Sequence, residues 1–112
     1  MAASDILERL YKLVQERRKS DPGKSYIAKR LQQGTAKIAQ KVGEEAVETV
    51  IAALSGDKKE IINESADLIF HWLMLLADTG VKLEDVMKEL QRREGISGLD
   101  EKASRKLKRK EG

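Results

Sequence analysis

Two clusters of acidic residues stand out in the sequence because of their spacing. The first holds Glu44, Glu45 and Glu48, and the second holds Glu64 and Asp67. Both lie in sequence typical of helices, and residues three or four apart on a helix share one face, with Cβ atoms about 5–6 Å apart. If the two helices pack antiparallel, four or five carboxylates point at one place. Such crowding requires protons or cations, and carboxylate oxygen is a preferred ligand of Mg²⁺. The spacing therefore predicts a divalent-metal site.

The residues around the first cluster favour a cleft over an ordinary solvated face. At about 100° per residue, Lys41 and the three glutamates fall within one stripe about 100° wide. Most of the remaining circumference is apolar or small: Ile38, Ala39, Val42, Ala46, Val47, Val50, Ile51, Ala53 and Leu54. We therefore expect the acids to line a cleft between packed surfaces. The alternative is a glutamate-rich helix whose charges are simply solvated.

The composition predicts an all-α protein of four to five helices in a single domain, with a helical core over 1–100 and a basic tail over 101–112. The chain has 112 residues, of which 37% are charged and 4% aromatic, and it has one proline, so strand signals are few. The absence of cysteine excludes disulfides and thiolate zinc sites. We expect a cytoplasmic protein without a secretory signal, because the N-terminus has no basic and apolar leader. We expect no membrane partner, because the apolar run over 68–77 is too short to span a bilayer.

The net charge of +3 lies in the C-terminal tail. Its lysines and arginines are Lys102, Arg105, Lys106, Lys108, Arg109 and Lys110, against Glu101 and Glu111. The rest of the chain is close to neutral, so the basic balance does not indicate a nucleic-acid surface, and we expect no nucleic-acid partner.

Hydrophobic periodicity and capping residues predict the helix boundaries. Ser4 or Asp5 caps a helix to about Arg18, and a turn over 20–23 leads to a short basic segment, 24–33, with Tyr26, Ile27 and Leu31 as apolar anchors. Three helices follow, over about 36–54, 58–79 and 83–94, and the tail from 99 onward forms a last basic helix. Thr35 and Asp57 are the expected caps, and Gly80 is a stop signal. Gly43, inside a helix, indicates close approach to the backbone.

The helix predicted over 58–79 is apolar nearly all round after Asp67. The apolar residues are Leu68, Ile69, Phe70, Trp72, Leu73, Met74, Leu75, Leu76 and Ala77. A helix of this kind must be buried on every side. A chain with four or five helices can hardly surround one of its own. We therefore expect an antiparallel bundle that is completed by a homodimer, most simply with two-fold symmetry.

The acidic spacing, Glu45-x-x-Glu48 followed by Glu64-x-x-Asp67, resembles the signature of the MazG-like all-α nucleoside triphosphate pyrophosphatases. The longer strings over 38–48 (IAQKVGEEAVE) and 64–71 (ESADLIFH) resemble the phosphoribosyl-ATP pyrophosphatase family of histidine biosynthesis. The pieces Ser25-Tyr26 and Lys102-Ala103-Ser104-Arg105-Lys106 are similar to that family too. The resemblance covers nearly the whole chain, and nothing in it corresponds to the cyclohydrolase domain to which many relatives are fused.

The resemblance implies a reaction and a set of residues. Phosphoribosyl-ATP and water would give phosphoribosyl-AMP and pyrophosphate, with Mg²⁺ as cofactor. Glu45, Glu48, Glu64 and Asp67 are the expected metal ligands. Glu44 and Glu45 are the expected catalytic groups, with Glu44 as a fifth ligand or the residue that orients water.

Six basic residues are expected to bind phosphate oxygens: Lys37, Lys41, Arg30, Lys29, Lys102 and Arg105. The two lysines before the acids are the first candidates, and the two tail residues would reach the ribosyl 5′-phosphate. The alternative for Lys37 and Lys41 is ordinary pairing along the helix with Glu44 or Glu45.

We expect His71 to be a hydrogen-bonded core residue, so it is left out of the metal set, although it could touch substrate or metal. Phe70 and Trp72 are expected in the core or the dimer interface. Three other functions stay open. A di-iron bundle would need Glu-x-x-His pairs, which a single histidine does not supply. A non-catalytic helical interaction module would leave the acids without a role, and a house-cleaning nucleotide pyrophosphatase would share the same acids.

Overall fold

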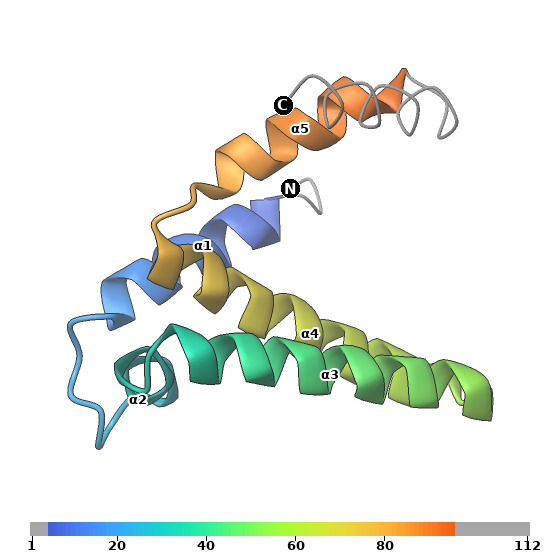
Figure 1. Cartoon of the computed structure of the whole chain (residues 1–112), viewed down its shortest axis with the longest axis horizontal. Coiled ribbons are helices and arrows are strands. Elements are labelled where there is room, and N and C mark those ends of the chain that lie inside the picture. The colour runs from blue at the N-terminus through green and yellow to red at the C-terminus, as the bar shows by residue number, and fades with distance from the viewer. Residues whose placement is uncertain (1–4, 96–112) are drawn as a thin grey trace, which may run out of the picture. The chain divides into compact units, whose positions relative to one another are not determined.

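The computed structural model describes residues 5–95 and confirms the all-α prediction. Five helices follow one another, and the described residues contain no strand (Figure 1): α1 (Asp5–Arg17), α2 (Tyr26–Gln32), α3 (Thr35–Ser55), α4 (Lys58–Thr79) and α5 (Leu83–Glu94). Each boundary lies within about two residues of the prediction. The expected helix in the tail lies outside the described residues.

The chain divides into two compact units at the bond between Val81 and Lys82. The first unit contains α1 to α4. In the second unit, the amphipathic helix α5 is stabilised along its surface by ion pairs between residues three or four apart, such as Lys88 with Glu84 at 3.0 Å and Arg92 with Glu89 at 2.7 Å. The expectation of a single domain stays a prediction.

Helices α3 and α4 form an antiparallel hairpin and lie side by side (Figure 1). Gly56 ends α3 in the left-handed conformation (φ 77°), which costs glycine little. The Asp57 side chain then accepts hydrogen bonds from the backbone N–H groups of Lys59 and Glu60, at 3.0 and 3.3 Å. The predicted Asp57 cap is therefore confirmed, and this short turn brings the acids of α3 opposite those of α4.

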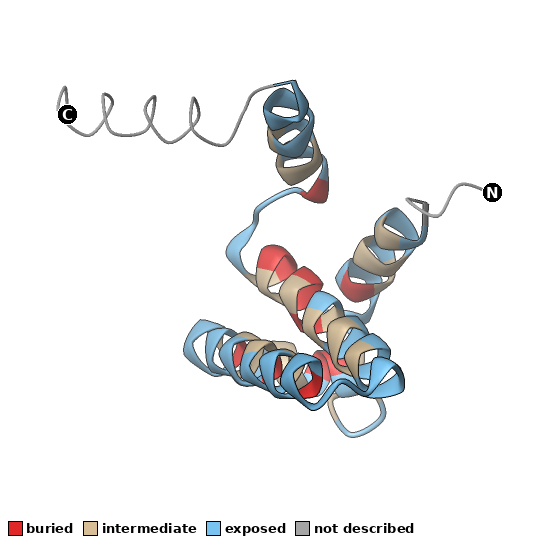
Figure 2. Ribbon diagram, turned by 90° about the vertical axis from the view of Figure 1, so that its right-hand side faces the viewer, coloured by how far each residue is buried: buried red, intermediate tan, exposed pale blue. Residues whose placement is uncertain are grey.

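The core joins α1 and α2 to one end of the hairpin, where α3 begins and α4 ends. Its buried members are Val14, Ile27, Ile38, Met74 and Ala77. Figure 2 shows buried residues on the facing sides of these helices. Polar contacts reinforce this end: the Tyr11 hydroxyl donates to the Val81 carbonyl (2.7 Å), just past the end of α4, and Arg18 donates to the Ala77 carbonyl (3.1 Å) in the last turn of α4.

Two sequence predictions about the start and the middle of α3 are wrong. Thr35 does not cap the helix, because Gly34 (φ 93°) occupies the cap position without a side-chain bond. The Thr35 hydroxyl instead donates to Asp78 on α4 at 2.5 Å. Gly43 is exposed, and no atom of residues 5–95 lies within 4 Å of the position that a Cβ would take, so no other part of the described chain closely approaches its backbone.

The far half of the hairpin exposes large apolar side chains. They are Val47, Val50, Ile51 and Leu54 on α3, with Ile62 and Ile69 on α4. Leu54 exposes 84% of its surface, and Ile69, in the stretch expected to be buried all round, exposes 41%. Residues 5–95 therefore cover α4 incompletely: Leu73 and Met74 are fully buried, whereas Trp72 is half-buried.

Candidate functional site

Three of the predicted metal ligands converge in the middle of the hairpin. Glu45 on α3 and Glu64 and Asp67 on α4 each place one carboxylate oxygen so that all three atoms lie within 4.8 Å of one another. Glu45 is buried, Glu64 is half-buried and Asp67 is exposed. We call these three residues the acid cluster. Its opening toward solvent gives a ligand access from the side of α4.

The electrostatics of the acid cluster favour a bound cation. The pKa of Glu64 is raised above its ordinary value of 4.5, first by desolvation of its carboxyl group and then by the negative charges of Glu45, Glu48 and Asp67. The exposed Glu48 is therefore close enough to act on Glu64, although it does not belong to the acid cluster. A divalent cation would relieve this repulsion more fully than one proton.

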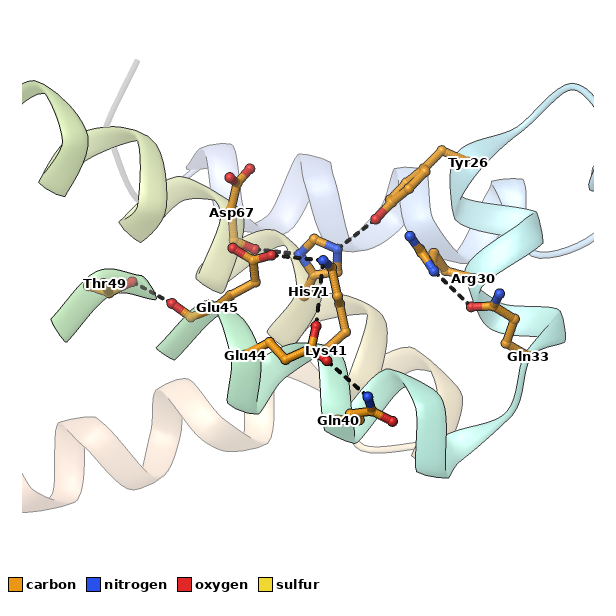
Figure 3. A network of polar contacts seen from close by, with 10 residues as sticks. All are labelled: Tyr26, Arg30, Gln33, Gln40, Lys41, Glu44, Glu45, Thr49, Asp67 and His71. Atoms are coloured by element: carbon orange, nitrogen blue, oxygen red, sulfur yellow. Dashed lines mark hydrogen bonds and ion pairs between the residues drawn. The ribbon is translucent and has the colours of Figure 1, made fainter. Parts of the chain in front are cut away.

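Lys41 connects the acid cluster to the surface beside it. Its Nζ lies 3.1 Å from Glu45 Oε1 and 3.9 Å from Glu44 Oε2. The pKa of Lys41 is raised, mainly by its hydrogen bond to Glu45. The pairing along the helix that was the alternative for Lys41 thus exists, and it also holds the ammonium group between the acids and an adjoining cleft (Figure 3).

An open cleft of about 180 Å³ lies beside the acid cluster, between α2 and the first half of α3. Its lining residues are Arg30, Gln33, Lys37, Gln40, Lys41 and Glu44, and we call it the cationic cleft. Three cations against one carboxylate make it a suitable place for an anion. Three of the predicted phosphate-binding residues, Arg30, Lys37 and Lys41, are therefore brought together here.

Glu44 faces the cationic cleft and does not join the acid cluster. Its carboxylate accepts a hydrogen bond from the Gln40 side-chain amide at 2.9 Å, and about half of the side chain is exposed (52%). Adjacent residues on a helix point about 100° apart, so Glu44 and Glu45 cannot both face α4. The five acids are consequently divided: three meet, Glu48 flanks them and Glu44 lines the neighbouring cleft.

Lys29, which was also predicted to bind phosphate, does not line the cationic cleft. Lys29 lines a separate hollow with Pro22, Ser25 and Tyr26, on another side of α2. Lys102 and Arg105 lie outside the described residues.

His71 is buried and hydrogen-bonded at both ring nitrogens, which confirms the expectation of a core histidine. Nδ1 lies 2.7 Å from the Asp67 carbonyl oxygen, and Nε2 lies 2.8 Å from the Tyr26 hydroxyl (Figure 3). The prediction that Tyr26 is an apolar anchor is wrong, because its side chain is 46% exposed and its hydroxyl reaches α4. Tyr26 is the first residue of α2 and directly follows the capping residue Ser25. This position at the helix end was the one sign in the sequence that the Tyr26 ring need not be buried.

The donor set fits a hard divalent cation. All three converging ligands are carboxylates, which Mg²⁺ prefers, and their partial exposure leaves room for water molecules in its coordination shell. A cation here would lie next to a cleft suited to anionic oxygens. Hydrolysis of a polyphosphate needs a metal, cations for the phosphates and carboxylates beside an attacking water, and this arrangement offers side chains suited to each of these tasks.

Comparisons with known proteins agree with this chemistry. A family model described as "Phosphoribosyl-ATP pyrophosphohydrolase" matches residues 7–94. Proteins named phosphoribosyl-ATP pyrophosphatase are similar along nearly their whole length. The one from Novosphingobium aromaticivorans is 57% identical over 94% of this chain and 98% of its own. The one from Erythrobacter litoralis is 57% identical over 90% and 97%, and the one from Zymomonas mobilis 55% identical over 92% and 96%. None of the described helices has the length and hydrophobicity needed to cross a membrane.

Proposed function

Because the chain belongs to the phosphoribosyl-ATP pyrophosphohydrolase family, we propose that it hydrolyses phosphoribosyl-ATP to phosphoribosyl-AMP and pyrophosphate, the second step of histidine biosynthesis. One structural observation carries the proposal: the acid cluster adjoins the cationic cleft, and Lys41 contacts the first while lining the second. The expected cytoplasmic location stays a prediction.

The proposed cofactor is Mg²⁺, held by Glu45, Glu64 and Asp67, with Glu48 as a further ligand. Bound there, Mg²⁺ would neutralise charge on the phosphates and the leaving pyrophosphate, and lower the pKa of a bound water. The converging oxygens and the raised pKa of Glu64 support this assignment. The charge of Glu48 acts on Glu64, so Glu48 lies close enough to the acid cluster to be proposed as a further ligand.

The proposed phosphate ligands are Arg30, Lys37 and Lys41. Arg30 offers a planar set of donors, whereas the lysines act as point charges on flexible side chains. Lys41 reaches Glu45 in this structure and could turn to a phosphate oxygen, because its ammonium group already borders the cationic cleft. Lys29, Lys102 and Arg105 stay predictions for other parts of the substrate.

Glu44 is the proposed group that orients the attacking water. Gln40 holds one of its carboxylate oxygens, which restricts the side chain, and its exposure leaves the carboxylate accessible from the cationic cleft. A carboxylate of this kind can accept a proton from water when it lies within hydrogen-bond reach.

We propose that the functional unit is a homodimer. The exposed apolar residues Val47, Val50, Ile51 and Leu54 share one face of α3 because they are spaced three or four residues apart, and Ile62 and Ile69 are exposed on the neighbouring α4. Contiguous apolar surface of this kind is typical of an interface. A second copy packed there would complete the helical bundle.

The second candidate function, hydrolysis of ordinary or damaged nucleotides, shares the same acids and differs in substrate. The deciding experiment measures pyrophosphate release from phosphoribosyl-ATP, ATP and dUTP, each with and without Mg²⁺. The proposed function requires Mg²⁺-dependent release with kcat/KM at least roughly tenfold higher for phosphoribosyl-ATP, which corresponds to about 1.4 kcal/mol of discrimination. Equal kcat/KM values for all three substrates would favour the house-cleaning function, and no release from any of them would favour the non-catalytic interaction module.

A further inference from the structure

We propose that Tyr26 is a positioning residue, which holds the Arg30 guanidinium at the cationic cleft by bridging it to His71 on α4. Neither Tyr26 nor His71 is assigned a role by the proposed function, and the proposal rests on that function for the identity of the substrate. Three contacts carry it, in order from the buried histidine outward to the arginine (Figure 3).

The first contact fixes the histidine. A carbonyl oxygen is an acceptor without a proton to donate, so His71 Nδ1 must carry the hydrogen that it shares with the Asp67 carbonyl at 2.7 Å. In the neutral ring, Nε2 is then an acceptor. The ring is 6% exposed and meets Phe70 edge-on, with centroids 5.9 Å apart, so its plane cannot turn freely.

The second contact joins two helices. The Tyr26 hydroxyl donates to His71 Nε2 at 2.8 Å, and the two rings meet edge-on at 6.0 Å. Tyr26 opens α2, a helix of seven residues that is too short to hold its own position. Because the side chain is 46% exposed, burial alone does not fix the ring. The hydroxyl therefore ties the start of α2 to the residue one helical turn after Asp67.

The third contact reaches the cationic cleft. The Arg30 Cζ lies 4.9 Å from the centroid of the Tyr26 ring, within the range of a cation–π interaction. One Nη of Arg30 donates to Gln33 at 3.0 Å, whereas its Nε is buried and makes no hydrogen bond within residues 5–95. The guanidinium is thus held between a ring and an amide, and only one of its five N–H groups donates a hydrogen bond to a side chain of the described residues. An anionic oxygen is the partner that the free Nη donors suit best.

Through these contacts, Tyr26 restricts the orientation of the Arg30 guanidinium. A guanidinium held in one orientation loses less freedom when it binds a phosphate than one that samples many rotamers. The same chain of contacts starts at the backbone of Asp67, so the proposed phosphate ligand keeps a fixed place relative to the acid cluster. Loss of the tyrosine should therefore weaken phosphate binding by way of Arg30 and leave the acid cluster intact.

The test is a double-mutant cycle between Tyr26→Leu and Arg30→Gln, read by calorimetric binding of inorganic pyrophosphate with Mg²⁺ and by KM for phosphoribosyl-ATP. We expect each single change to weaken pyrophosphate binding and raise KM by roughly tenfold, with kcat changed less than about threefold. The double variant should bind as weakly as Arg30→Gln alone. Tyr26→Phe, which keeps the ring and removes the hydroxyl, should weaken binding by roughly fivefold.

Tyr11→Phe is the matched control. It removes a tyrosine hydroxyl bonded at 2.7 Å to the Val81 carbonyl, away from the cationic cleft. It should lower the melting temperature about as much as Tyr26→Phe while leaving pyrophosphate affinity and KM unchanged. A purely structural role for Tyr26 predicts equal effects of the two changes on every readout, and that result overturns the proposal.

Two further results also overturn it: losses of affinity that multiply in the double variant, and pyrophosphate binding by Arg30→Gln that equals binding by the parent. A failure of the proposed function is distinguishable from these. If the parent protein does not hydrolyse phosphoribosyl-ATP, the substrate assignment fails, whereas the pyrophosphate cycle still decides whether Tyr26 acts through Arg30.

Discussion

Replacement of Glu64 by glutamine should raise stability without Mg²⁺ and remove most of the stabilisation that Mg²⁺ gives. The pKa of Glu64 is raised by desolvation and by nearby acids, so the folded chain holds this proton more tightly than the unfolded chain. Ionised Glu64 therefore lowers the stability of the metal-free protein. The loss develops as pH rises from the unfolded value, about 4.5, through the raised pKa, and it persists above it. Glutamine cannot ionise, so the substitution removes this loss of stability.

Bound Mg²⁺ should reverse the order of stability, so that the parent protein becomes more stable than the Glu64→Gln variant. A ligand present at about 100 times its Kd stabilises the fold by about 2.7 kcal/mol, or roughly 10–20 °C in melting temperature for a small domain. Loss of groups that only support metal ligands weakens binding about 10–100-fold, and loss of a direct ligand should reach at least the upper value. At the same Mg²⁺ concentration the variant would then gain about 0.4 kcal/mol, or roughly 2–3 °C.

The assay is thermal unfolding of both proteins between pH 4 and pH 8, with and without Mg²⁺. Without metal, the variant should melt above the parent at pH 7.5, and the two should converge near pH 4. With Mg²⁺ at pH 7.5, the parent should melt above the variant. A variant that is less stable than the parent without metal, or one that keeps the full shift with Mg²⁺, would refute the reasoning.

Glu84→Gln is the matched control for this prediction. Glu84 lies on α5 and pairs with Lys88 at 3.0 Å, and the hydrogen bond from Lys88 lowers its pKa. The effect of ionised Glu84 on stability is therefore opposite in sign to that of Glu64. Ionised Glu84 stabilises the fold above about pH 4.5, and this stabilisation disappears as pH falls through the lowered pKa. The change should lower the melting temperature slightly at pH 7.5 and leave the Mg²⁺ shift unchanged.

Three other changes test separate parts of the account. The double variant Lys37→Met, Lys41→Met should raise KM for phosphoribosyl-ATP by roughly tenfold or more while the Mg²⁺-induced melting shift persists; an unchanged KM in steady-state assays would remove both lysines from phosphate binding. Asp57→Ala should lower unfolding stability by about 1 kcal/mol in urea titrations, because two N–H groups of α4 lose their cap, with kcat/KM retained. Val50→Glu should convert a dimer to a monomer in sedimentation, since it places a charge in the exposed apolar surface; an unchanged sedimentation coefficient, or a monomeric parent, would contradict the proposed interface.

Most of the fold could be predicted from local signals. Apolar periodicity, Asp57 and the glycines at 56 and 80 locate α4 and its neighbours to within about two residues, because caps and left-handed glycines act within one turn. The role of Thr35 could not be predicted in the same way. Its hydroxyl can cap its own helix or bond to another, and the distant Asp78 decides between them.

The spacing of the acids also predicted where the candidate site lies. It could not predict which acids join the acid cluster and which line the cationic cleft. A stripe about 100° wide holds Glu44, Glu45 and Glu48 together on a helical wheel. Their separation depends on which edge of the stripe faces α4, and this is set by the packing of Ile38 and Ala52, which are buried. The contact between Tyr26 and His71 joins residues 45 positions apart, so no local sequence pattern predicts it.

The most direct measurement is anomalous diffraction from crystals of the protein grown with Mn²⁺ in place of Mg²⁺. The account predicts an anomalous peak within ligand distance of carboxylate oxygens from Glu45, Glu64 and Asp67, about 2.0–2.2 Å for a small hard divalent cation. Crystals that hold Mn²⁺ elsewhere, with these three carboxylates bound to water alone, would contradict it.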